Sequence, residues 1–307
     1  MTTLRVGTRQ SRLALWQAGF VRDRLLAVHS DLKVEIVGIS TQGDRSQETL
    51  LPPAGGKGLF LKELEEALLA GQVDLAVHSM KDVPVNLPEG LHIPVICERG
   101  DPRDALISVK TVTLDDLSDG ATVGTCSLRR QCLLHHRVSG VRTLPLRGNV
   151  DTRLQRLDQG DFDAIVLAAA GLRRLGLEQR IGQIILVEDM LPAVGQGAIG
   201  IECRTADPVT IQLIQPLDHA GTHVRVRAER AANEALGGDC RLPVAFYAEI
   251  SGMMLRVRGM VGNPDGSEVL FADEYGAAKD AVKIGRRVAK ALRAQGARRI
   301  LRGVGTD

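Results

Sequence analysis

Hydrophobic and polar positions alternate in blocks through the first third of the chain. Short apolar runs at residues 4–7, 33–39 and 73–78 predict buried strands. Longer segments at residues 11–29 and 59–70 carry apolar side chains at helical spacing and predict helices. Strands that alternate with helices are typical of a mostly parallel sheet covered by helices. The pattern therefore predicts an α/β domain.

The middle third repeats this order of elements. Residues 6–11 resemble residues 123–127, and residues 71–77 resemble residues 160–166. The repeat predicts two similar α/β domains that face each other across a cleft, and a cleft between domains is a favoured ligand site. Residues 191–198 read as a crossover back to the first domain. Their glycines are typical of a hinge and equally of ordinary turns.

The last third has a different pattern. A helix is expected at residues 222–236, alternating strands around 250–260, a turn at 263–266 and a basic amphipathic helix at 277–294. This order predicts a smaller α+β domain at the carboxyl end. The expected domain ranges are 1–97 with 198–216 for the first, 98–197 for the second and 217–307 for the third.

Composition narrows the functional classes. The 307 residues are 44% apolar and 25% charged, as in ordinary globular proteins. A net charge of +2 and an aromatic content of 3% argue against a nucleic-acid binder. No apolar segment is long enough to span a bilayer, and the chain starts in a strand rather than a signal peptide. We therefore expect a cytoplasmic protein without membrane contact.

The five cysteines are scattered and form no C-x-x-C pair, so neither a disulfide framework nor a metal site is expected. Most of them read as small buried hydrophobic residues. Cys240 differs, because two glycines precede it and Pro243 follows it closely. That composition predicts an exposed loop in which a thiol could react. An incidental loop cysteine is the alternative.

A strand that ends in charged residues is the strongest candidate for chemistry. The apolar run at 73–78 is followed by Ser79, Lys81 and Asp82 before Pro84 stops it. In α/β domains, ligands bind at the carboxyl ends of such strands. Asp82 therefore stands where a catalytic carboxylate would be placed. A plain surface turn is the alternative, and it would be preferred if the segment stood alone.

Four other turns carry basic groups where a helix is expected to start. They contain Arg9, Lys57, the pair Arg129 and Arg130, and Arg147 followed by Arg153. Helix amino-termini already favour anions, and a guanidinium grips a carboxylate with a two-pronged set of donors. Together these turns predict an anionic, carboxylate-bearing ligand.

These segments together resemble the porphobilinogen deaminase family, over nearly the whole chain. The most specific motif is residues 77–84, Val-His-Ser-Met-Lys-Asp-Val-Pro. Further support comes from residues 55–58, 127–131, 146–149, 191–197 and the Cys240 loop. The resemblance implies three domains, the first two similar to two-lobed periplasmic binding proteins. It also implies a monomeric transferase of heme biosynthesis that condenses four porphobilinogen molecules into hydroxymethylbilane and releases ammonia.

The resemblance assigns roles to individual residues. Cys240 would carry a dipyrromethane cofactor through a thioether. Asp82 would be catalytic, an ionised carboxylate that stabilises the cationic, azafulvene-like species left when ammonia departs. Cofactor contacts are implied for Lys81, Asp82, Ser79, Thr125, Ser127, Arg129, Arg130, Arg147, Gly148 and Arg153. Substrate contacts are implied for Arg9, Ser11, Lys57, Asn149, Arg174 and Gln196. No metal site is implied.

Three positions depart from the family pattern. Residues 52–54 replace a stretch that often contains lysine, Cys126 stands where serine is common, and Asp239 stands where glycine is common. The runner-up interpretation is a non-enzymatic two-lobed protein that binds a small carboxylate. The placements of Asp82 and Cys240 favour the enzyme. A nucleic-acid-binding regulator is the weakest alternative.

Overall fold

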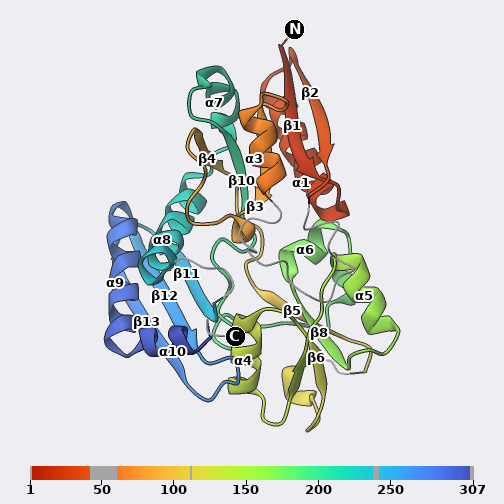
Figure 1. Ribbon diagram of the computed structural model, residues 1–307, viewed down its shortest axis with the longest axis vertical. Coiled ribbons are helices and arrows are strands. Elements are labelled where there is room, and N and C mark those ends of the chain that lie inside the picture. The colour runs from red at the N-terminus through yellow and green to blue at the C-terminus, as the bar shows by residue number, and fades with distance from the viewer. Residues whose placement is uncertain (1, 42–60, 111–112, 238–241, 305–307) are drawn as a thin grey trace. The chain divides into compact units, whose positions relative to one another are not determined.

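The fold is described from a computed structural model of the chain (Figure 1), over residues 2–41, 61–110, 113–237 and 242–304. The chain divides into two compact units. Unit 1 comprises Met1–Arg99 and Ala198–His223, and unit 2 comprises Gly100–Gly197 and Val224–Asp307. The three-domain division expected from the sequence stays a prediction.

Unit 1 is built on a five-stranded sheet. In spatial order its strands are β2 (Leu32–Ile39), β1 (Thr2–Arg9), β3 (Leu75–Ser79), β10 (Ile199–Arg204) and β4 (Leu91–Ile96). β1 is parallel to β2 and β3, whereas β10 is antiparallel to β3 and β4. The sheet is thus mostly parallel, as predicted, with one reversed strand.

Helices cover both faces of this sheet. α1 (Arg12–Val28) packs Ala18, Val21 and Leu25 onto the face that presents Leu75 and Val77 of β3. α3 (Lys62–Leu69) packs onto the opposite face, against Ala76. α7 (Pro208–Ile214) follows β10. Alternate residues of a strand point to opposite faces, and Leu75, Ala76, Val77 and His78 of β3 are all buried, so this strand is buried on both sides.

Unit 2 contains a second five-stranded sheet with the same topology. Its strands, in the same spatial order, are β7 (Arg142–Leu144), β6 (Thr122–Gly124), β8 (Ala164–Ala168), β5 (Asp104–Ser108) and β9 (Gln183–Ile184). β6 is parallel to β7 and β8, and β5 is antiparallel to β8 and β9. The helices of this sheet are α4 (Leu128–Arg137), α5 (Val150–Asp158) and α6 (Ala169–Arg174).

The register makes the two sheets equivalent residue by residue. Val6 of β1 pairs with Leu75 of β3, and Val123 of β6 pairs with Ala164 of β8. This places the repeated sequence segments at matching positions, so the predicted similarity of the two α/β lobes is confirmed. In each sheet the reversed strand, β10 in unit 1 and β5 in unit 2, does not belong to the consecutive β-α-β segment that forms the parallel strands. The crossover predicted at residues 191–198 is likewise confirmed, because β10 directly follows it and enters the sheet of unit 1.

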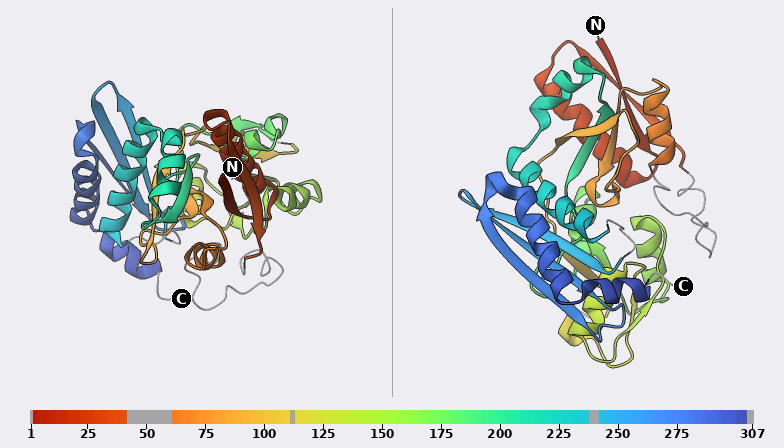
Figure 2. Two further views of the ribbon diagram at one scale, coloured as in Figure 1. Left: turned by 90° about the horizontal axis from the view of Figure 1, so that it is seen from above. Right: turned by 60° about the vertical axis from the view of Figure 1, so that its left-hand side comes forward.

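The carboxyl-terminal part is a small α+β layer, as predicted. Three antiparallel strands, β11 (Val244–Ser251), β12 (Met254–Gly262) and β13 (Val269–Ala277), form its sheet. α8 (Ala220–Leu236), α9 (Ala281–Ala294) and α10 (Ala297–Val304) contribute to the core on one face (Figure 2). The other face packs against α4 within unit 2. The predicted helix at 277–294 starts four residues late, because β13 continues to Ala277 and a 3-10 turn at Ala278–Asp280 follows it.

Candidate active site

The carboxyl edge of the unit 1 sheet holds a cavity of about 70 Å³. It lies where β1 and β3 end, so the loops after two adjacent parallel strands supply its walls. The lining residues are Arg9, Ser11, Leu13, Ala14, Gln17, Leu61, Val77, His78, Ser79 and Asp82. Arg9, Ser11, Ser79 and Asp82 were all predicted as site residues, and the fold brings these four together.

Asp82 ends a single 3-10 turn, Met80–Asp82 (η2), that follows β3. The turn is fixed to the sheet because the Met80 amide donates to the Ala198 carbonyl at 3.0 Å. The Asp82 side chain is exposed and makes no hydrogen bond or ion pair with any described residue. Lys81 is partly buried beside it. A carboxylate at a cavity wall, without a partner among the described residues, is available to a ligand.

Ser11 caps α1 and keeps a donor for a ligand. Its Oγ accepts a hydrogen bond from the Ala14 amide at 3.3 Å. A hydroxyl that accepts in this way still has its own proton to donate. Ser11 can therefore cap the helix and bind a carboxylate at the same time, next to the positive end of the helix dipole.

Gln17 is a cavity residue that sequence reasoning missed. It is 3% exposed, and its Nε2 donates to Ser79 Oγ at 2.7 Å. The signal was a polar side chain within the buried stripe of α1, between Ala14 and Val21. This bond fixes the Ser79 hydroxyl, so Ser79 is held from α1 while its backbone belongs to β3.

The carboxyl edge of the unit 2 sheet gathers a second group of predicted residues. Ser127 caps α4 and Asn149 caps α5, each by accepting a backbone N–H. The Ser127 hydroxyl and the Asn149 amide keep donors, by the same argument as for Ser11. Thr125 is buried, and its Oγ1 accepts the Ser127 amide at 3.1 Å, which shapes the turn rather than facing solvent. Cys126 between them is exposed.

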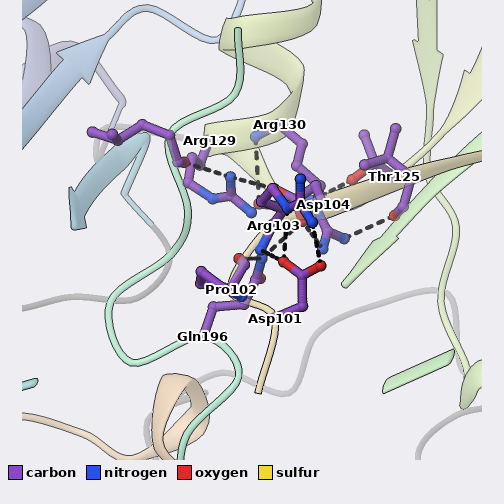
Figure 3. Close-up of polar contacts among 11 residues, drawn as sticks. Asp101, Pro102, Arg103, Asp104, Thr125, Arg129, Arg130 and Gln196 are labelled. Carbon is purple, nitrogen blue, oxygen red and sulfur yellow. Dashed lines mark hydrogen bonds and ion pairs between the residues drawn. The ribbon is translucent and has the colours of Figure 1, made fainter. Parts of the chain in front are cut away.

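Arg129 and Arg130 are buried in a cluster with Asp104 (Figure 3). Arg129 Nη1 and Arg130 Nη2 each lie 2.7 Å from an Asp104 carboxylate oxygen. Burial alone would raise the pKa of Asp104, but the charges and hydrogen bonds of the two guanidinium groups outweigh it and hold that pKa well below its ordinary value. Asp104 is therefore ionised in the folded protein, and the three charges sum to one net positive charge.

The two arginines of this cluster differ in what they can still bind. All three guanidinium nitrogens of Arg130 donate to the protein, to Asp104 and to the Val166 carbonyl. Arg129 donates only through Nη1, to Asp104 and the Leu191 carbonyl. Its Nε and Nη2 contact no described acceptor. Ligand contacts by these residues stay predictions, and Arg129 is the better placed of the two.

The loop before α5 presents Arg147 to solvent. Arg147 is exposed, and its guanidinium makes no hydrogen bond or ion pair with any described residue. Gly148 has φ +106°, and an added Cβ would lie 2.9 Å from the Thr152 side chain, so only glycine fits this turn. Arg153 Nε donates to the Gly148 carbonyl at 2.8 Å and braces the same loop. The result is a fixed backbone that carries one exposed cation.

Arg174 and Gln196 hold the segment that leads to the crossover. Arg174 Nη2 donates to the Gly197 carbonyl at 2.6 Å, and Gln196 Nε2 donates to the Pro102 carbonyl and to Asp104. Both side chains thus make structural contacts, and their predicted substrate contacts stay predictions. Lys57, Cys240, Asp239 and residues 52–54 lie outside the described residues.

Family models match almost the entire chain. The dipyromethane cofactor binding domain of porphobilinogen deaminase matches residues 4–212, and the C-terminal domain of the same enzyme matches residues 223–294. The chain belongs to the porphobilinogen deaminase family. It is accordingly an enzyme of tetrapyrrole biosynthesis, with porphobilinogen as its substrate and dipyrromethane as its cofactor.

Solved structures with partial similarity include proteins from other families. The VFT2 domain of BvgS from Bordetella pertussis is 17% identical over 69% of this chain and 84% of that chain, with a TM-score of 0.41. The periplasmic aliphatic sulphonate binding protein SsuA from Escherichia coli is 16% identical over 76% of this chain and 70% of that chain, with a TM-score of 0.42. At such values these similarities carry no argument about this chain.

Each sheet edge, taken by itself, carries donors that suit the carboxylates of the dipyrromethane cofactor. They supply hydroxyl donors at Ser11 and Ser127, an amide donor at Asn149 and an exposed guanidinium at Arg147. No helix in the described part of the chain is both long and apolar enough to cross a bilayer.

Proposed function

We propose that Asp82 is the catalytic carboxylate with which this chain builds hydroxymethylbilane from four porphobilinogen molecules. The observation that carries the proposal is the placement of Asp82, which has no described protein partner and lines the same cavity as Arg9 and Ser11. The guanidinium of Arg9 and the hydroxyls of that cavity suit the acetate and propionate groups of a pyrrole. The carboxylate suits its N–H groups and the positive charge that develops when ammonia leaves.

The remaining residue roles follow from the same chemistry. When bound, the dipyrromethane supplies the nucleophilic pyrrole carbon from which the chain grows. Arg147, Arg129 and the donors of Ser127 and Asn149 would bind its carboxylates and those of added pyrroles. Asp82 would hold the reacting N–H groups and remain ionised through the reaction. Cys240 would carry the thioether.

A steady-state assay tests this function. Purified protein is incubated with porphobilinogen, and substrate loss, ammonia release and the linear tetrapyrrole are followed together. Asp82→Asn keeps the size of the side chain but removes its charge, and loss of such preorganised stabilisation costs about 10²-fold or more in kcat. Asp31→Asn is the matched control, because Asp31 is exposed and precedes β2 at the opposite edge of the same sheet.

Two outcomes would count against the assignment. Near-normal turnover in folded Asp82→Asn would remove Asp82 from the chemistry. Tight binding of porphobilinogen by the wild type without ammonia release would favour the alternative of a carboxylate-binding protein.

The attachment site has its own test. Intact-protein mass spectrometry of protein from cells that make porphobilinogen should show an added dipyrromethane, and peptide mapping should place it on Cys240. Cys240→Ser should lack the adduct and nearly all activity. Cys126→Ser should keep both, because the exposed Cys126 thiol is the control for non-specific attachment. An adduct on Cys126 would overturn the assignment.

We further propose a monomer that works in the cytoplasm, on the strength of the family resemblance. Size-exclusion chromatography with light scattering and fractionation of cells that express the chain test these two statements.

A further inference from the structure

A buried histidine–glutamate pair, outside the set of predicted site residues, contributes one side chain to the wall of the Asp82 cavity. His78 Nε2 lies 2.7 Å from Glu202 Oε2, and the two side chains are 4% and 0% exposed. The second carboxylate oxygen, Glu202 Oε1, is buried without a hydrogen-bond partner among the described residues. His78 also lines the cavity that contains Asp82.

The sheet register explains how the two side chains meet. His78 of β3 stands directly opposite Gly200 of β10, and Glu202 stands opposite Ala76. His78 and Glu202 are therefore diagonal neighbours on one face of the sheet, within reach of long side chains. Gly200 has no side chain to separate them, and a Cβ there would lie 2.2 Å from Met80 Sδ.

The sheet of unit 2 shows that the fold does not require this pair. The register of β8 and β5 matches that of β3 and β10, so Leu167 stands at the position of His78 and Ile107 at the position of Glu202. Leu167 and Ile107 are 3% and 1% exposed and belong to one apolar core. The same backbone arrangement is thus built with hydrocarbon at both positions.

The stability of the fold does not explain why unit 1 has His78 and Glu202 where unit 2 has apolar residues. Moving an imidazole and a carboxylate out of water is costly, and a buried ion pair often contributes no more than well-packed apolar residues of similar volume. Two further titratable groups lie close enough to interact with Glu202. They are Glu65 of α3, whose pKa is raised by burial and by the Glu202 charge, and His92 of β4, whose Nε2 is also buried without a described partner.

The chemistry of the pair defines what it offers the cavity. An ionised carboxylate only accepts hydrogen bonds, so with Glu202 ionised the imidazole proton shared with it is on Nε2. In the neutral ring, Nδ1 then carries a lone pair and accepts. No described residue donates to Nδ1. Of the two residues, Glu202 is fully buried, whereas His78 is part of the cavity wall.

We propose that Glu202 is a positioning residue that acts on the reaction through His78. It fixes the imidazole as a single Nε2–H tautomer, so that the cavity has a second hydrogen-bond acceptor beside Asp82. Two acceptors suit a ligand that brings several N–H donors, such as adjoining pyrroles or an ammonium group. This inference rests on the proposed function for the identity of that ligand, and on the two sheets alone for the role of the pair.

The first experiment gives unit 1 the residues of unit 2. The double variant His78→Leu with Glu202→Ile should unfold at a urea midpoint no lower than that of the wild type. Its kcat for porphobilinogen should fall at least about tenfold, the factor that one lost hydrogen bond of 1.4 kcal/mol gives, while KM changes less. Ile201→Val is the control, because Ile201 lies on the same strand but faces the core against α1. It should lower the midpoint slightly and leave kcat unchanged.

The second experiment reads the tautomer without turnover. Protein labelled with ¹⁵N-histidine is studied by long-range ¹H–¹⁵N NMR, and the His78 signals are assigned by their absence in the double variant. The wild type should show one Nε2–H tautomer for His78. Glu202→Gln, whose amide can donate as well as accept, should show a mixture and an intermediate kcat.

The outcomes separate this inference from the proposed function. A folded double variant with wild-type kcat overturns the inference. If the double variant does not fold, Glu202→Gln decides, and a folded Glu202→Gln with unchanged tautomer and kcat also overturns it. A wild type that does not consume porphobilinogen would defeat the proposed function, whereas the tautomer measurement would still test what Glu202 does to His78.

Discussion

Replacing Asp104 with asparagine should strongly destabilise unit 2. Asp104 is fully buried and accepts three hydrogen bonds from guanidinium groups, at 2.7 Å from Arg129 Nη1, and at 2.7 and 3.1 Å from Arg130 Nη2 and Nε. Asparagine has nearly the same shape. It removes the negative charge and turns one acceptor oxygen into a donor, which would face a guanidinium donor.

The hydrogen bonds of Asp104 determine how much stability the substitution should cost. A hydrogen bond to a charged group contributes about 1.5–3 kcal/mol, and the amide keeps an acceptor for only one of the two arginines. The other guanidinium is then buried without its counter-charge. Removing one partner of a buried ion pair costs about 3–5 kcal/mol, and we expect Asp104→Asn to lower the free energy of unfolding by that amount.

Urea unfolding followed by circular dichroism is the suitable assay, because Trp16, the single tryptophan, lies in unit 1 and would not report on unit 2. Asp161→Asn is the matched control. Its ion pair with Arg156, at 2.8 Å, is in the same unit but about 40% exposed on both sides, so its loss should cost no more than about 1 kcal/mol. If Asp104→Asn cost no more than Asp161→Asn, the buried cluster would not stabilise the fold as argued.

Four further measurements follow from the structure. The pKa of Asp104 is lower in the folded protein than its unfolded value of about 3.9. The stabilising effect of the Asp104 charge is therefore complete above about pH 5 and is lost as the pH falls. The difference in unfolding free energy between wild type and Asp104→Asn should accordingly become smaller in acid. Iodoacetamide at pH 8 should label Cys126 in the native protein, whereas burial raises the pKa of Cys132 and Cys203 to about 12 and should protect them until unfolding, as peptide mass spectrometry would show. Gly197→Ala should lower the free energy of unfolding in urea by about 1–3 kcal/mol, because φ is +87° and a Cβ would lie 2.8 Å from the Gly100 carbonyl oxygen. Gly19→Ala is the control, since a Cβ on this α1 residue meets open space and should stabilise the protein slightly. Arg147→Ala should raise KM for porphobilinogen about tenfold or stall chain extension, and Arg142→Ala, an exposed arginine where β7 begins, should do neither.

Much of the architecture could be predicted from the sequence, because short apolar runs mark its strands and helical spacing of apolar residues marks its helices. The apolar run that became β3 and the helical spacing that became α1 depend on local patterns, and both were placed within two residues. The reversed strands β5 and β10 were not individually predicted. Each joins its sheet between strands from another part of the chain, and no local pattern encodes that partner choice.

The site was predicted less completely, for a physical reason. Charged groups at strand ends are visible in a sequence, and Asp82 and Arg9 were found in this way. Whether an arginine points to a ligand or to a buried aspartate depends on cross-strand register, and Asp104 gave no local signal that it would pair with Arg129 and Arg130. Gln17 and Glu202 were missed because each is a polar residue in an otherwise apolar face, a pattern with many harmless causes.

The two sheets carry their buried charges at different positions of the same framework. Asp104 of β5 matches Ile199 of β10 in register, and Glu202 of β10 matches Ile107 of β5. Charge in unit 2 therefore lies on the face that packs against α4, where it anchors two arginines at the start of that helix. Charge in unit 1 lies on the α3 face, where it contacts the wall of the Asp82 cavity. If the framework needed either charge to fold, both units would need it at the same position. Their different placement indicates that the shared backbone requires neither group. Under the proposed function, unit 2 would then bind anions and unit 1 would hold the N–H groups.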